Sequence, residues 1–135
     1  MYAAVRSRIV ASWAALEPTV PLAFESVGYQ RDPAGTAFLI VEVQWSGGEP
    51  ASIGSPGNNL VRRYGSIWFH AFIPVGTSVD RALEIVQHAA SIFENQSFGG
   101  VICTAMEPGA GESGSDDGLY YGQSVQIPFF HDEAA

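Results

Sequence analysis

Residues 109–118 read GAGESGSDDG, and the first six match the G-x-G-x-x-G pattern that binds phosphate in dinucleotide folds. In those folds the glycines follow a strand and lead into a helix, whose N-terminal amides bind the phosphate. Here an alternating strand pattern follows Gly118, and Ser115-Asp116 stands where a P-loop has Lys-Ser/Thr. The segment is also acidic, which repels phosphate. The sequence therefore predicts an acidic connection between two strands, and no nucleotide site.

The same acidic segment offers hard oxygen ligands for calcium. Glu112, Asp116 and Asp117 have the right chemistry, but their spacing fits no EF-hand loop, whose ligands alternate and end in a glutamate. A solvated acidic tip is the simpler interpretation. We expect neither a calcium site nor any cofactor.

The histidines and the cysteine do not form a recognisable catalytic or metal motif. His70, His88 and His131 fall in a strand, a helix and a tail, and no H-E-x-x-H pattern or Cys-His cluster is present. The flanking Trp68 and Phe72 favour a packed or interface role for His70. Cys103 is expected to be a buried strand thiol. With no G-x-S-x-G elbow either, we do not expect an enzyme.

Composition excludes further classes of protein. The chain has 135 residues, 47% of them hydrophobic, which suits one folded domain with its own core. Its 14 acids exceed its 6 bases, giving a net charge of −8, which disfavours binding to nucleic acid or anionic membranes. All six bases are arginine, so lysine Schiff-base chemistry is excluded. No apolar run reaches the roughly 18–20 residues of a membrane span.

Hydrophobic periodicity predicts two helices. The first spans residues 2 to 16, with one apolar face formed by Val5, Ile9, Trp13 and Leu16, and prolines follow it. The second runs from about residue 79 to 95. Its apolar stripe comprises Val79, Ala82, Leu83, Val86, Ala89, Ala90 and Phe93.

Alternation predicts the strands. A short strand is expected at residues 22–24, long strands at 36–45 and 61–73, and two further strands at 100–106 and 119–129. We expect loops at 46–59 and around 107–118, and a flexible tail at 131–135. This order predicts a single α+β domain over residues 1–135. It would be an antiparallel or mixed sheet of four to five strands, with both helices packed on one face.

The second face of this sheet is too apolar for free contact with water. If one face packs on the helices, the other still carries Phe38, Ile40, Trp68 and Phe72, beside His70. Large exposed apolar patches usually mark contacts, so these five residues are the candidate subunit interface. The alternative is that the long loops fold back over this face.

The whole pattern resembles the tail terminator proteins of long-tailed bacteriophages, which are related to minor tail proteins at the head–tail joint. The resemblance lies in the N-terminal helix, VPLAFESVGYQ (20–30), TAFLIVEVQW (36–45), and RRYGSIWFHAFIPVGTSVDRALEIVQHAASIF (62–93) with its P-x-G break and alanine-rich helix. A glycine-rich acidic loop and GLYYGQSVQIPFF (118–130) close it. The likeness covers almost the whole chain as order and pattern.

The resemblance implies a structural virion protein, made in the host bacterial cytoplasm and located at the tail–neck junction. Such a protein forms a ring, usually of six copies, that caps the tail tube, stops its polymerisation and meets the head connector or stopper protein. DNA would pass through the lumen without specific binding. Loop residues would contact the tube or the neck, or line the lumen. The candidates are Glu49, Asn58, Asn59, Glu112, Asp116 and Asp117.

Two other functions compete with this one. Another neck component, such as a stopper or head–tail completion protein, shares the size and symmetry. A small-ligand binding domain would instead use the aromatic second face as a pocket wall.

Overall fold

A computed structural model describes residues 2–24, 37–50, 60–74, 76, 79–112 and 120–134. Helix α1 spans Tyr2–Leu16 and helix α2 spans Val79–Phe93. The strands are β1 (Leu22–Phe24), β2 (Phe38–Pro50), β3 (Leu60–Pro74), β4 (Ser97–Phe98), β5 (Val101–Cys103), β6 (Glu107–Glu112) and β7 (Tyr120–Ala134).

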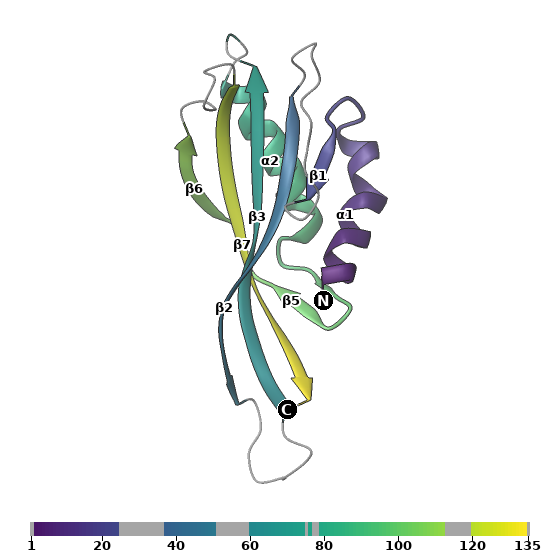
Figure 1. Cartoon of the computed structure of the whole chain (residues 1–135). Coiled ribbons are helices and arrows are strands. Elements are labelled where there is room, and N and C mark those ends of the chain that lie inside the picture. Colours follow the sequence, from purple (N-terminus) through teal and green to yellow (C-terminus); the bar gives the residue numbers. More distant parts are fainter. Residues whose placement is uncertain are drawn as a thin grey trace.

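The described strands form one mixed sheet in the order β1-β2-β3-β7-β5-β4, with β6 also paired to β7. Only the pairing of β1 with β2 is parallel among these described pairs. The long, twisted strands β2, β3 and β7 form the centre, and α2 lies behind them (Figure 1). The predicted α+β class and mixed sheet are confirmed, but the seven strands exceed the predicted four to five.

The extra strands arise because β7 is long enough to pair with two segments along one edge. β5 pairs with its residues 129–131 and β6 with residues 122–126. The strand expected at 100–106 is present but shorter, at Val101–Cys103, and the first part of the loop expected around 107–118 is instead strand β6. Between β5 and β6, the backbone N–H of Thr104 donates to the carbonyl oxygen of Pro128 at 2.9 Å, an ordinary length for a backbone hydrogen bond.

One face of the sheet and both helices enclose the core, as alternation predicts. We call this side of the sheet the helix face. Its buried residues are Leu39, Val41 and Val43 of β2, Ile67, Phe69, Ala71 and Ile73 of β3, and Val125, Ile127 and Phe129 of β7. The helices contribute Val5, Ile9 and Trp13 from α1 and, from α2, Ala82, Ile85, Val86, Ala89, Ala90, Ile92 and Phe93.

Each helix departs slightly from its predicted inner face. Leu16 and Leu83 were expected in the core and are exposed, whereas Ile85 is buried. Helix α2 begins with Asp80 in its first turn, which suits the helix dipole, and ends at Phe93 because Asn95 adopts a left-handed conformation with φ 56°. Neither described helix is long and apolar enough to cross a membrane.

The end of the chain is more ordered than the expected flexible tail at 131–135. β7 continues to Ala134, which pairs with Leu60 of β3. Arg62 holds this end, because its Nε and Nη2 donate to the two carboxylate oxygens of Asp132 at 2.8 and 3.0 Å. The same guanidinium lies 4.4 Å from the centre of the Phe130 ring. These contacts explain why the polar segment stays in the sheet.

Strand β2 also runs further than predicted, to Pro50, after a bulge between Trp45 and Gly47. Gly65 lies opposite Trp45 and lets the strands approach closely there. A Cβ at position 65 would meet the Gln44 carbonyl oxygen at 2.4 Å and Phe129 Cζ at 2.7 Å. A side chain at this position would therefore force the strands apart.

Candidate functional site

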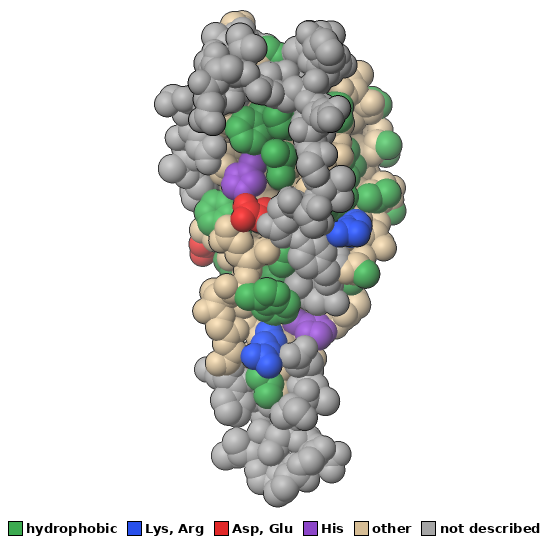
Figure 2. Space-filling model, viewed as in Figure 1, with side chains coloured by type: hydrophobic (Ala, Val, Ile, Leu, Met, Phe, Trp, Pro, Cys, Tyr) green, Lys and Arg blue, Asp and Glu red, His purple; other side chains and the backbone are tan. Residues whose placement is uncertain are grey.

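The face of the sheet opposite the helices carries the predicted interface residues. We call it the open face. Its described members are Phe38, Ile40, Glu42 and Gln44 of β2, Tyr64, Ser66, Trp68, His70 and Phe72 of β3, and Ser124, Gln126, Pro128 and Phe130 of β7. Figure 2 views the molecule from this side and shows hydrophobic, histidine and acidic side chains gathered along the middle of the sheet.

A chain of hydrogen bonds crosses the open face from β2 to β7. His70 Nε2 lies 3.0 Å from Glu42 Oε2, and His70 Nδ1 lies 2.7 Å from Ser124 Oγ. A neutral imidazole protonated at Nε2 satisfies both contacts, since it donates to the carboxylate and accepts from the hydroxyl. Gln44 Nε2 donates to the other oxygen of Glu42 at 2.7 Å. The Trp68 ring stacks on the imidazole, with centroids 5.9 Å apart.

This serine, histidine and glutamate have the composition of a nucleophilic triad, but their setting favours a structural role. Ser124 is only 3% exposed, whereas an attacking hydroxyl must reach a substrate carbonyl. The hydrogen bond from Gln44, aided by that from His70 and opposed by burial, lowers the pKa of Glu42. The carboxylate thus stays ionised and holds the imidazole in place. The chain of contacts fixes the surface that Trp68 presents.

The predicted interface residues are brought together, but not equally exposed. Ile40, Trp68, His70 and Phe72 are half-buried and lie side by side on β2 and β3. Phe38 is only 5% exposed and stacks on Phe72 at 5.1 Å between centroids, so it supports the surface from within.

Sequence reasoning missed Glu42 and Ser124 as partners of His70. The signal lies in the register, which aligns Ile40, His70 and Ser124 in one row across three strands. Since the partners of His70 are 28 and 54 residues away in the chain, hydrophobic alternation alone does not reveal that row.

The predicted loop contacts are placed only in part. Glu49 lies within β2, opposite Arg62, and Glu112 lies within β6, opposite Gly122. The first part of the acidic segment, through residue 112, therefore forms a strand. Asn58, Asn59, Asp116 and Asp117 lie outside the described residues.

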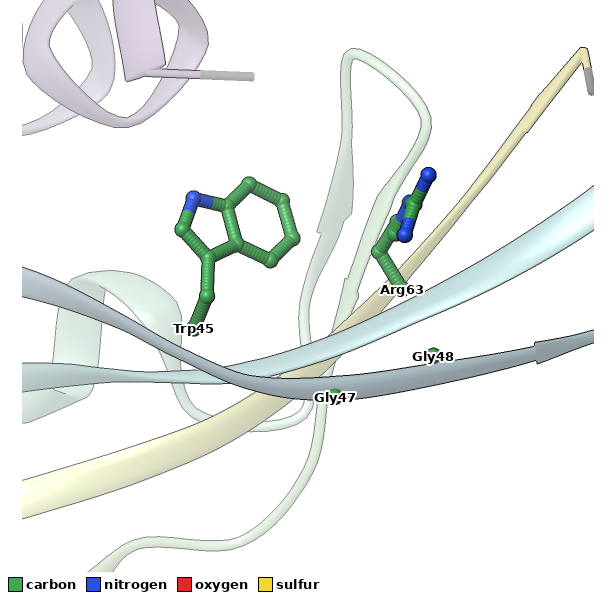
Figure 3. A pocket seen from close by; sticks show the side chains of 4 residues that line it. All are labelled: Trp45, Gly47, Gly48 and Arg63. Carbon is green, nitrogen blue, oxygen red and sulfur yellow. The ribbon is translucent and has the colours of Figure 1, made fainter.

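A surface cavity of about 360 Å³ lies beside the β2 bulge, lined by Trp45, Gly47, Gly48 and Arg63. The side chains of Trp45 and Arg63 stand on the same side of the strands, with the two glycines below (Figure 3). Trp45 is 52% exposed, although its ring packs edge-to-face with the ring of Phe129 in β7, with centroids 5.5 Å apart. An indole beside a guanidinium suits a planar anionic group.

A third group of polar side chains joins the two helices. Glu17, at 4% exposed, accepts from Arg81 Nη1 and Nη2 at 2.9 and 2.6 Å and lies 2.6 Å from His88 Nδ1. Glu84 lies close enough that its carboxylate, Glu17 and His88 could together surround a metal ion. The positive charge that a metal ion would supply is already provided by the guanidinium of Arg81, which contacts the carboxylates of Glu17 and Glu84. This group is therefore an ion-pair cluster between α2 and the end of α1.

The cluster lowers the pKa of its carboxylate. Burial alone would raise the pKa of Glu17, but hydrogen bonds from Arg81 and His88 outweigh burial and lower it. Elsewhere, burial raises the pKa of Cys103 to about 11, and the thiol is buried in β5 as predicted.

Comparison with known proteins bears on the fold. No family model and no curated protein matches this sequence. A solved structure without a functional description is 16% identical, with a TM-score of 0.68, and the match covers 99% of this chain and 94% of that one. A weaker structural neighbour, from the virion of a native gene transfer agent particle, is 11% identical, with a TM-score of 0.49 over 97% of this chain and 93% of that one. The first of these matches shows that this chain has a fold already seen in another protein.

Proposed function

We propose that this chain is a structural virion protein that assembles into a ring of identical copies, most simply six, at the end of a phage-type tail. The ring caps the completed tail tube, stops its polymerisation and joins it to the head connector or stopper protein at the tail–neck junction. The proposal combines the resemblance in the sequence with the order of helices and strands that the resemblance implies.

The observation that carries the proposal is the open face. Ile40, Trp68 and Phe72 are only partly buried in the single chain, on a surface fixed by the hydrogen bonds of His70. An apolar surface held in one arrangement loses little conformational entropy on contact, so it suits a permanent subunit interface.

The net charge of the chain favours a ring that does not bind DNA. The chain carries 14 acids and 6 bases, so a ring of copies is strongly acidic. Like charges repel, and DNA would therefore pass through the lumen without adhering.

The function is tested by adding the protein to polymerising tail tube subunits and imaging the products by negative-stain electron microscopy. We expect shorter tubes, each ending in an added ring. Gln87→Glu, which adds a charge on exposed α2, is the matched control and should still cap the tubes. Unchanged tube lengths and bare tube ends would refute the terminator role. A ring that binds the head connector but leaves the tubes unchanged would instead identify another neck component.

The cavity at Trp45 and Arg63 favours a second candidate function, small-ligand binding. Its volume of about 360 Å³ lies within the usual range of ligand sites, roughly 300–1,000 Å³. A thermal-shift screen with aromatic carboxylates should raise the melting temperature if this function is correct. The Trp45→Ala variant should then lose the shift.

A further inference from the structure

Helix α1 differs chemically from the rest of the chain. Residues 2–16 contain Arg6 and Arg8 and no acid, whereas all 14 acids lie elsewhere. Helix α2, by contrast, carries Asp80 and Glu84. Helix α1 therefore presents an unusual surface for a protein of net charge −8.

The outward side of α1 is also apolar. Val5, Ile9 and Trp13 already pack inward against the core. On the other side, Val10 is 56% exposed and Leu16 is 39% exposed. Exposed alanines fill the surface between and around them, at positions 3, 11, 14 and 15. Exposed apolar side chains that lie together usually mark a contact, so another surface is expected to cover this part of α1.

The open face is the matching surface, because neither of the two described helices covers it (Figure 1). Its central rows run from Phe38 to Gln44 on β2, a length of about 20 Å at the usual strand rise of about 3.3 Å per residue. The fifteen residues of α1 span about 22 Å at the usual helical rise of about 1.5 Å per residue. A helix packed on a sheet face is also how this fold forms its own core.

Charge favours the same pairing. The open face carries the ionised carboxylate of Glu42, and Glu107 lies in the same row as Trp68 through their shared neighbour Gln126. Arg6 lies over the Phe24 ring, and Arg8 donates to the Ile92 carbonyl and lies over the Phe98 ring, so both charges are held on α1 without a described acidic partner for Arg8. The acid-free, positively charged helix complements the acidic open face, whereas two open faces would bring like charges together.

We propose that the outer side of α1 in one copy packs against the open face of the next copy. This inference rests on the self-association in the proposed function. The two surfaces differ and lie on opposite layers of the molecule, so the contact is head-to-tail and leaves one of each surface free on every dimer. Such a contact repeats from copy to copy, and it closes into a ring when the rotation between neighbouring copies divides a full turn. The exposed alanines allow close approach to Trp68 and Ile40.

Disulfide cross-linking between two single-substitution chains tests this contact. Ala14→Cys places a thiol on the outer side of α1, and Ser66→Cys places one on the open face. Cys103 can remain, because it is buried and its pKa is raised to about 11. The two chains carry tags of different size and are mixed and oxidised at a concentration at which the wild-type chain is oligomeric.

We expect one main product, the mixed cross-link between Ala14→Cys and Ser66→Cys, and little product from either chain alone. A chain with both substitutions should give a ladder whose largest member counts the copies in the ring. Gln87→Cys on α2 replaces Ala14→Cys as the control and should give no mixed product. Cross-linking of either chain with itself would overturn the proposal in favour of a symmetric contact.

The outcomes also separate this contact from the proposed function. If the chain forms oligomers and caps tubes but gives no mixed cross-link, the contact is wrong and the ring stands. If the wild-type chain stays monomeric at every concentration and on tubes, self-association itself fails. As a second readout, Ala14→Glu should keep the melting temperature of the monomer and lower the oligomer fraction at least tenfold, since it places an acid against the acidic open face.

Discussion

At the residue scale, Glu17 is the side chain whose ionisation matters most for the fold. It is enclosed at the end of α1 and bonded to Arg81 and His88 on α2. Because these bonds favour the charged form, its pKa is lowered from the usual 4.5. A lowered pKa stabilises the folded state above pH 4.5, and that contribution is lost as the pH falls through the folded-state pKa.

We therefore expect Glu17→Gln to lower the free energy of unfolding at pH 7 by about 1–3 kcal/mol, the usual value of hydrogen bonds to a charged group. Urea unfolding measures it, and the gap to wild type should shrink below pH 4.5. Glu84→Gln is the control, because Glu84 also contacts Arg81 but is exposed, and it should cost under about 1 kcal/mol. A gap that stays constant down to about pH 3 would contradict the assignment.

Gly65 lies in β3, where the backbone of β2 and the Phe129 ring of β7 come too close for any side chain. A Cβ there would overlap the Gln44 carbonyl and the Phe129 ring. We expect Gly65→Ala to destabilise the protein by about 1–3 kcal/mol, the usual cost of overpacking. Ser66→Ala, at the next position, removes an atom instead and should change little. A melting temperature for Gly65→Ala equal to that of Ser66→Ala would show that the strands can adjust.

At the scale of elements, the two sides of α1 should have separate roles. Ile9 is fully buried against the sheet, and the adjacent Val10 is exposed. Ile9→Ala should cost about 2–5 kcal/mol in the free energy of unfolding because it leaves a cavity in the core. Val10→Ala should change it by less than about 0.5 kcal/mol, as usual for exposed positions. Similar losses for both variants in denaturant unfolding of the monomer would show that Val10 also packs inward.

The sequence allowed most elements to be predicted, because each long element has a clear period of burial. The predicted long strands and both helices are present, and Ile67, Phe69, Ala71 and Ile73 face the core as alternation predicts. Helix α1 was harder, because its apolar residues occur on all sides. The inner position predicted for Leu16 is wrong for that reason.

What the sequence did not predict depends on pairing between distant segments. Strand β6, where a loop was expected, follows from pairing with the long strand β7. The strand at residues 131–134 depends on Arg62, about 70 residues earlier. The contacts of His70 with Glu42 and Ser124 likewise follow from the register of three strands. Composition and periodicity describe one segment at a time and carry no register.

At the scale of the whole molecule, one side of the sheet is buried in the core, and the other carries the proposed contact between copies. The buried residues of the helix face belong to the core, so they contribute to folding within one chain. The open face is covered only in part, and Trp68 lies near its centre, stacked on the hydrogen-bonded His70. Substitutions there should affect association between chains more than folding of one chain.

Trp68→Asp tests this division. The variant places a charge on the apolar surface near Glu42 and removes the stacked ring, so we expect the oligomer to dissociate while the monomer keeps its circular dichroism spectrum. Trp68→Phe keeps an aromatic ring on His70 and should assemble almost as the wild type does. Native mass spectrometry measures the oligomer, and thermal unfolding of dilute protein measures the monomer. If Trp68→Asp instead unfolds the dilute monomer, Trp68 belongs to the core, and the partly covered open face is the outer wall of a single stable chain.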